Sequence, residues 1–186
     1  MLFEVVQRLD ALDTPYMLTG SMAANVYASP RMTRDLDLVV AIAPDTVERL
    51  PEAFPPDCYY LSPEAARAAV DNTTCFNLIH LATMLKIDIM VRKAGEYRLL
   101  EFSRRQLHTI EGQPVWVVSK EDLILSKLEW ARESLSDRQL ADVRNLLATG
   151  CDQQYLQQWA NYLQLTAIPR VTKVDVVMGC KVIFLT

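Results

Sequence analysis

The chain has 186 residues, of which 51% are hydrophobic and 23% charged, as in an ordinary globular protein. Its formal net charge of −4 argues against a general nucleic-acid-binding protein, because phosphate binding requires a positive field. The N-terminal segment carries acids within its apolar pattern, unlike a signal peptide, and no apolar run approaches the roughly 20 residues of a membrane helix. The four cysteines are scattered without a Cys-x-x-Cys pair, which predicts reduced thiols and no structural zinc site. We therefore expect a cytoplasmic protein without a membrane segment.

Short helices and strands alternate in the first part of the chain. The predicted elements, in chain order, are a helix over residues 2–12, a strand over 16–19, a helix over 22–28 and a strand over 35–40. Gly20 breaks the chain after the first strand, and Ser21 is predicted to cap the N-terminus of the second helix.

The middle of the chain continues the same mixture. We predict helices over residues 46–53, 63–70 and 97–105, strands over 75–81 and 86–91, and a hairpin with strands over 107–110 and 115–118. Together these elements predict an α+β fold, in which helices flank one mixed β-sheet.

The composition changes after the hairpin. Acidic residues at the start of residues 120–134 favour a helix there, and further helices are predicted over 137–148 and 152–164. The last residues have no helical pattern, although Val182 to Leu185 resemble a strand; they form either an added strand or a tail foreign to the domain. The predicted organisation is a core over residues 1–118, a helical part over 119–165 and an atypical tail over 166–186.

Three aspartates on two predicted strands form the first candidate site. Alternate residues of a strand share a face, so Asp35 and Asp37 point one way, about 7 Å apart, and Leu36 and Leu38 the other. Asp88 lies between two isoleucines in a second strand. If the two strands are neighbours, the three carboxylates meet, and hard divalent cations such as Mg²⁺ prefer oxygen ligands of this kind. Alone, Asp35 and Asp37 are equally well explained as solvated residues on an exposed strand face, and for Asp88 alone that explanation is the better one.

Gly20 and Ser21 form the second candidate site. They stand between a predicted strand and a predicted helix, where free backbone N–H groups and the helix dipole favour phosphate. Glycine lets the backbone approach a phosphate closely, and a serine hydroxyl adds a hydrogen bond. An ordinary turn glycine followed by a helix cap explains the same two residues, so the pair gains meaning only together with the aspartates.

The order of these motifs resembles that of polymerase-beta-like nucleotidyltransferases. Leu18 to Val40 is most similar to the minimal bacterial nucleotidyltransferases near the type IV abortive-infection toxins, with a Gly-Gly/Ser helix start and an Arg-x-Thr-x-Asp-(Leu/Ile)-Asp strand. Phe76 to Ile89 resembles the strand pair that carries the third carboxylate, and two later helices also resemble family motifs. The likeness covers roughly residues 1–165 and implies the nucleotidyltransferase fold.

The resemblance implies specific roles for the site residues. Catalytic residues would be Asp35, Asp37, Asp88 and Lys127, and the three aspartates would bind Mg²⁺ or Mn²⁺. Nucleotide-binding residues would be Gly20, Ser21, Arg34, Lys127 and Asp142. Lys127 would reach the phosphates, with Asp142 orienting it, although both are also ordinary helix residues. Arg31 and Arg34 either contact the triphosphate or an acidic acceptor, or balance the charge of the aspartates.

These features predict an enzyme that moves a nucleoside monophosphate from a nucleoside triphosphate to an unidentified hydroxyl of a protein, a tRNA or a small molecule. The resemblance adds a cognate toxin or antitoxin as an expected partner. The alternative is a non-catalytic nucleotide-binding or partner-binding protein with the same fold, such as an antitoxin. The presence of all three aspartates favours the enzyme.

Overall fold

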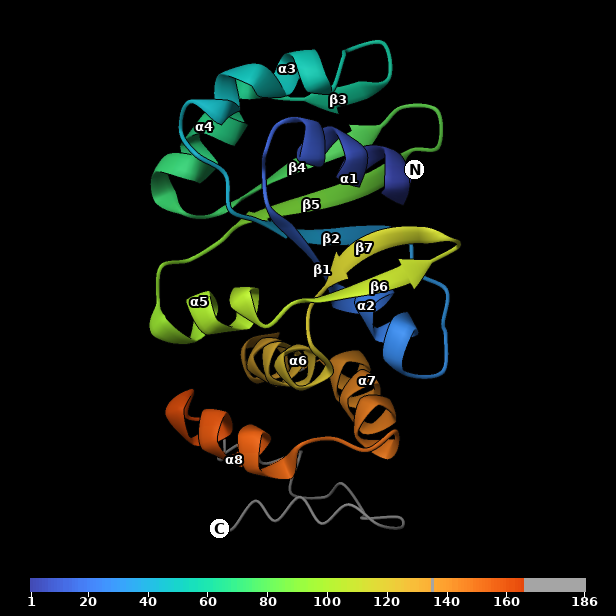
Figure 1. Cartoon of the computed structure of the whole chain (residues 1–186), viewed down its shortest axis with the longest axis vertical. Coiled ribbons are helices and arrows are strands. Elements are labelled where there is room, and N and C mark those ends of the chain that lie inside the picture. The colour runs from blue at the N-terminus through green and yellow to red at the C-terminus, as the bar shows by residue number, and fades with distance from the viewer. Residues whose placement is uncertain (135, 166–186) are drawn as a thin grey trace. The chain divides into compact units, whose positions relative to one another are not determined.

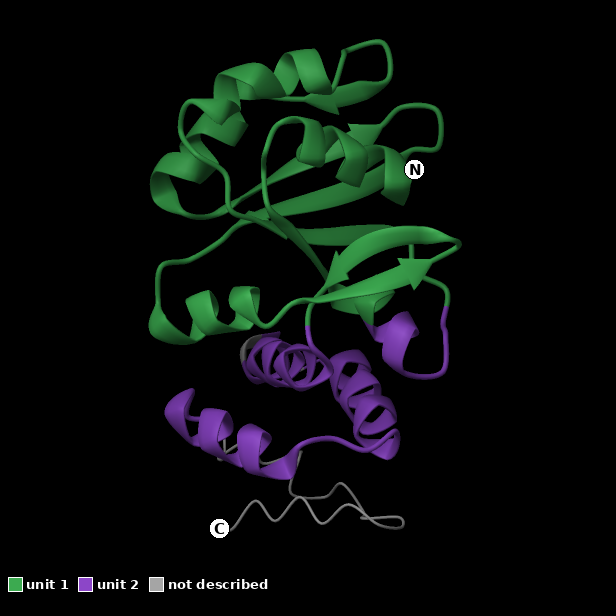
Figure 2. Cartoon of the chain, viewed as in Figure 1, with its two compact units in different colours: residues 1–23, 32–118 green, residues 24–31, 119–186 purple. Residues whose placement is uncertain are grey.

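A computed structural model describes residues 1–134 and 136–165, so the atypical tail predicted over residues 166–186 lies outside the described residues (Figure 1). The chain divides into two compact units (Figure 2). Unit 1 comprises residues 1–23 and 32–118, and unit 2 comprises residues 24–31 together with the chain from Ser119 onward. The first boundary falls within helix α2 (Gly20–Tyr27).

Unit 1 contains a seven-stranded mixed sheet in the order β3-β4-β5-β2-β1-β7-β6. The strands are β1 (Tyr16–Thr19), β2 (Asp35–Val40), β3 (Tyr59–Leu61), β4 (Cys75–His80), β5 (Leu85–Val91), β6 (Gln106–Ile110) and β7 (Gln113–Val117). The pairs β2–β5 and β1–β7 are parallel, and the other neighbours are antiparallel. This arrangement confirms the predicted mixed sheet and places the strand of Asp88 directly beside that of Asp37.

Local chemistry explains several element boundaries in unit 1. Its helices are α1 (Leu2–Ala11), the 3-10 helix η1 (Thr46–Arg49), α3 (Leu50–Ala53), α4 (Pro63–Asn72) and α5 (Glu96–Ser103). Ser62 caps α4 by accepting a hydrogen bond from the Ala65 N–H, and Pro63 takes the first helical position. Glu111 and Gly112 both have positive φ, as a two-residue hairpin turn between twisted strands requires.

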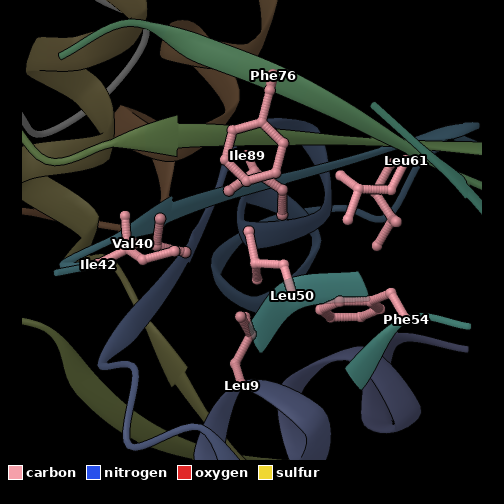
Figure 3. A pocket seen from close by; sticks show the side chains of 9 residues that line it. Leu9, Val40, Ile42, Leu50, Phe54, Leu61, Phe76 and Ile89 are labelled. Atoms are coloured by element: carbon pink, nitrogen blue, oxygen red, sulfur yellow. The ribbon is translucent and has the colours of Figure 1, made fainter. Parts of the chain in front are cut away.

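The apolar core of unit 1 lies on the sheet face opposite to the aspartates. Leu36, Leu38 and Val40 are fully buried, whereas Asp35 is exposed and Asp37 half-buried. Leu9 of α1, Leu50 of α3 and Phe54, the residue after α3, lie on this core face, where a small cavity has only apolar side chains in its lining (Figure 3). The cavity therefore belongs to the core packing and offers no polar group to a substrate.

Phe54→Ala tests this packing. Phe54 is 4% exposed and stacks edge-on against Tyr59, so its removal leaves a void that a rigid core fills only in part. We expect the free energy of unfolding to fall by about 3–5 kcal/mol. Urea denaturation measures the change, and Leu99→Ala, at a side chain 42% exposed, serves as the control with a much smaller loss. Equal losses in the two variants would contradict the assigned core.

Unit 2 contains three helices from the C-terminal part of the chain. They are α6 (Lys120–Ser134), α7 (Asp137–Ala148) and α8 (Gln153–Tyr162), and the side chains of Ser136 and Asp152 cap α7 and α8. Before α6, the buried Ser119 hydroxyl accepts from the Asp122 N–H and donates to the Asp122 carboxylate, which also accepts from the Tyr155 hydroxyl. The start of α6 is thereby tied to α8. In residues 1–134 and 136–165, no helix is long and apolar enough to cross a membrane.

Four sequence predictions differ from the structure. Strand β3 was not predicted, and the helix predicted over residues 46–53 is a 3-10 turn followed by one short α-helical turn. The hairpin turn is Glu111-Gly112 alone, so Gln113 already belongs to β7. The prediction that Ser21 caps α2 is wrong: the helix begins at Gly20, whose φ of +68° lets it occupy the sharp turn from β1, and Ser21 lies inside the first turn.

Candidate active site

The strand register brings the predicted carboxylates together in unit 1. In the parallel pair β2–β5, Asp37 lies directly opposite Asp88, and Asp35 lies opposite Lys86. Neighbouring strands are about 4.8 Å apart, and directly paired residues point to the same face. Asp35, Asp37 and Asp88 therefore share one face of two central strands, which is the side of the sheet away from the apolar core.

Two polar residues extend this arrangement across four strands. Thr19 on β1 pairs with Asp37, and Asn77 on β4 pairs with Asp88. We call Thr19, Asp37, Asp88 and Asn77 the polar row. Sequence reasoning assigned no role to Thr19 or Asn77. The alternation of apolar and polar residues along β4 could have indicated that Asn77 lies on the polar face, since Phe76 and Leu78 are buried and Asn77 between them is exposed.

Gly20 lies in close contact with the carboxylate of Asp37. A Cβ atom built on Gly20 would come within 1.9 Å of Asp37 Oδ2 and 2.8 Å of Asp37 Cβ. No side chain fits there, and the φ of +68° also favours glycine. The structure thus places the first turn of α2, which carries Gly20 and Ser21, beside Asp37. Both residues are half-buried.

Asp88 is held by its two neighbours on the same face. Lys86 Nζ lies 2.8 Å from Asp88 Oδ1 and 3.1 Å from Oδ2, and the Asn77 amide donates to Oδ1. The hydrogen bond to Asp88 raises the pKa of Lys86, and the charges of Asp88 and Asp35 act in the same direction, because each favours the protonated amine. Lys86, which had no predicted role, is thus the cation of the carboxylate cluster.

The donor chemistry of this face fits a divalent metal ion. Three carboxylates on adjacent strands supply the oxygen ligands that Mg²⁺ and Mn²⁺ prefer, and the missing side chain of Gly20 leaves the space that the Asp37 carboxylate occupies. As the side chains lie, no group of three or more His, Cys, Asp or Glu residues in the described part of the chain is gathered closely enough to hold an ion. Metal binding by all three aspartates therefore requires their side chains to move closer together.

The remaining predicted residues are distributed between the units. Arg34, in unit 1, is exposed one residue before β2. Lys127 and Asp142 lie in unit 2, on α6 and α7, and are 3% and 4% exposed. Lys127 Nζ donates to Asp142 Oδ2 at 2.7 Å and to Gln139 Oε1 at 3.0 Å. A contact of Lys127 or Asp142 with nucleotide stays a prediction.

Arg31, itself partly buried, completes an ion cluster in unit 2. Its guanidinium binds both Asp142 oxygens, with Nε and Nη2 each 2.8 Å away. The Asn25 side chain exchanges two hydrogen bonds with the Arg31 backbone, at 2.9 and 3.0 Å. Burial alone would raise the pKa of Asp142, but the hydrogen bonds from Arg31 and Lys127 outweigh it and hold that pKa below its usual value. Arg31 thus pairs with an aspartate outside the polar row.

Asp142→Asn is expected to lower the free energy of unfolding by about 3 kcal/mol, because it leaves two cations near one neutral amide. The lowered pKa of Asp142 means that its contribution is present above a pH of about 4 and is lost as the pH falls through the folded-state pKa. Denaturant unfolding at pH 7 and pH 3 measures both effects, and the variant should lose less stability than the parent between them. Asp137→Asn, at an exposed carboxylate, should cost under about 1 kcal/mol; an equal cost would contradict the cluster's role.

A mixed sheet with paired aspartates on neighbouring central strands and a glycine turn against one of them defines the nucleotidyltransferase fold. Comparison with solved structures agrees. An antigenic nucleotidyltransferase-like protein from Paracoccidioides brasiliensis is 21% identical, with a TM-score of 0.52 over 87% of this chain and 85% of that one. The lincomycin-bound lincosamide antibiotic adenylyltransferase LnuA is 14% identical, with a TM-score of 0.53 over 78% and 93% of the two chains.

A third similar structure is the antibiotic-resistance factor ANT(2'')-Ia, which is 15% identical, with a TM-score of 0.53 over 88% of this chain and 89% of that one. Comparison with models of known protein families finds no match, and comparison with curated protein sequences finds none either. The likeness therefore establishes the nucleotidyltransferase fold.

Proposed function

We propose that this chain is a metal-dependent nucleotidyltransferase that moves a nucleoside monophosphate from a nucleoside triphosphate to a hydroxyl acceptor. The register of β2 and β5, which sets Asp37 opposite Asp88 on an accessible face, carries the proposal. The Gly20 turn beside Asp37 supports it, because free N–H groups at a helix start favour phosphate. The fold shared with the adenylyltransferase LnuA and with the antibiotic-resistance factor ANT(2'')-Ia supports it further.

Asp35 and Asp37 would hold Mg²⁺ or Mn²⁺ with Asp88, and the ion would supply charge stabilisation to the phosphates. The first turn of α2 at Gly20 and Ser21 would bind phosphate oxygens, and Arg34 and Lys127 would add positive charge. Asp88 would accept the proton of the acceptor hydroxyl while the oxygen of that hydroxyl bonds to the α-phosphorus. The bond between the α-phosphorus and the bridging oxygen breaks, and pyrophosphate leaves.

The acceptor that we place first is a small molecule with a free hydroxyl. LnuA was solved with lincomycin, and ANT(2'')-Ia was solved with adenylyl-2''-tobramycin; each chain is covered to about 90% or more by the likeness. The net charge of −4 disfavours a long nucleic-acid acceptor. A tRNA end and a protein hydroxyl are the other two acceptors to be tested.

The proposal is tested with the four α-³²P-labelled nucleoside triphosphates, each with and without Mg²⁺. Incubation with small hydroxyl compounds, total tRNA and cell protein should give one labelled acceptor class, with release of pyrophosphate that stops when the metal is chelated. Calorimetric titration of the same nucleotides gives an independent reading. Failure of every nucleotide to bind in the presence of Mg²⁺ would rule the function out.

The resemblance to abortive-infection toxins extends the proposal to a toxin–antitoxin pair. If the chain is a toxin, its expression should arrest growth in a way that requires Asp37, and the product of a neighbouring gene should relieve the arrest. Growth that is unaffected by the chain, alone or with Asp37 replaced, would argue against the toxin role and leave the transferase activity standing.

A further inference from the structure

Lys86 occupies a place in the site where a cation alters metal binding. It is the register partner of Asp35 on the neighbouring strand, and it precedes Asp88 by two residues on the same face of β5. Its amine contacts both Asp88 oxygens while its side chain stays 49% exposed, so a solvated positive charge stands beside Asp88 on the face that the three aspartates share. The amide of Asn77 holds Asp88 from the adjacent strand β4.

The charges on this face can be counted. Asp35, Asp37 and Asp88 carry three negative charges, and Lys86 reduces their sum to −2. A free Mg²⁺ or Mn²⁺ ion is attracted by the carboxylates and repelled by the amine. A complex of the metal with a nucleoside triphosphate has the opposite preference, because four negative phosphate charges outweigh the ion and leave the complex at about −2. The charge of Lys86 therefore opposes the binding of a free metal ion and favours the binding of the metal–nucleotide complex.

We propose that Lys86 is a resident cation that makes the site select metal arriving with the nucleotide over free metal. It weakens the binding of free ions by lowering the negative charge and by occupying Asp88, and it strengthens the binding of the anionic complex. In this role Lys86 is a specificity-determining residue that has no contact with the acceptor oxygen or the α-phosphorus. The inference rests on the proposed nucleotidyltransferase function, since it concerns the ligand of the same site.

The test uses Lys86→Met and measures two affinities by calorimetry. The first ligand is Mn²⁺ alone, and the second is Mn²⁺ with the α,β-methylene analogue of whichever nucleoside triphosphate the parent binds. We expect free Mn²⁺ to bind about three- to tenfold more tightly and the complex to bind about three- to tenfold more weakly, with both changes shrinking as salt is raised. Lys86→Arg keeps the charge and should stay within about twofold of the parent for both ligands.

Lys93→Met is the matched control, because it removes the same charge from an exposed lysine beyond the end of β5. It should leave both affinities unchanged. Affinities of Lys86→Met that move in the same direction, or that equal those of the parent, would overturn the inference. A parent protein that binds no metal–nucleotide complex in an Asp37-dependent manner would instead overturn the proposed function, and the inference would fall with it.

Discussion

Replacing Asp37 with asparagine is expected to slow nucleotidyl transfer by about a thousandfold, with little change in stability. Asparagine keeps the shape of the side chain but removes the charge that would hold a divalent ion between Asp35 and Asp88, and a metal contributes several kcal/mol of transition-state stabilisation. The measurement is transfer of the α-³²P label to the acceptor, together with calorimetric binding of the metal–nucleotide complex. Both signals should fall together.

Asp57→Asn is the control for this experiment. Asp57 is an exposed carboxylate of the same unit, outside β2, β4 and β5, so the variant changes the net charge equally without touching the polar row. Its activity should match the parent. If Asp37→Asn retained more than about a tenth of the parent rate, the carboxylate would not be a metal ligand, and the chemistry proposed for this face would be wrong.

Gly20→Ala is expected to abolish nucleotidyl transfer, because it disturbs the backbone turn that lies against Asp37. The new Cβ would meet Asp37 Oδ2 at 1.9 Å, so Asp37 or the start of α2 must move, and alanine at a φ of +68° adds about 1–2 kcal/mol of strain. Gly112→Ala is matched in conformation, because Gly112 has a φ of +80° and no atom within 4 Å of its Cβ position. It should lose about 1 kcal/mol of stability and keep full activity.

A double-mutant cycle separates the two effects of Gly20→Ala. Asp37→Ala removes the Oδ2 and Cγ contacts and leaves only the Cβ contact at 2.8 Å, so Gly20→Ala should cost less stability in that background than in the parent. The free energies of unfolding in urea give the coupling. Additive losses would show that Gly20 and Asp37 do not contact each other, and equal activity of the Gly20→Ala and Gly112→Ala variants would contradict the role of the turn.

The sequence predicts the elements of the site better than it predicts their contacts. Alternation along Asp35 to Val40 and Lys86 to Val91 correctly separates a core face from a carboxylate face, because period-two burial is local information. The pairing of Asp37 with Asp88 was conditional on the two strands being neighbours. Strand order and register depend on packing across the whole sheet, so no single segment encodes them.

The missed features have the same physical origin. Strand β3 is three residues long and lies at the edge of the sheet after Pro55 and Pro56, so it has too few residues to show a period. The importance of Lys86 and Asn77 comes from their register with Asp35 and Asp88, which is known only once β4 and β5 are aligned. The partly buried pairing of Arg31 with Asp142 joins residues 111 positions apart and has no local signal.

That separation has a consequence for synthesis on the ribosome. Residues 24–31 belong to unit 2, yet they are made long before Lys127 and Asp142. Asp142 forms ion pairs with both Lys127 and Arg31. At roughly 5–20 residues per second, Arg31 waits about 6–22 s for its acidic partner to be translated. The strands of unit 1 emerge within that interval. The strands of the sheet that carries the aspartates can therefore pair before the Arg31 segment has its final surroundings.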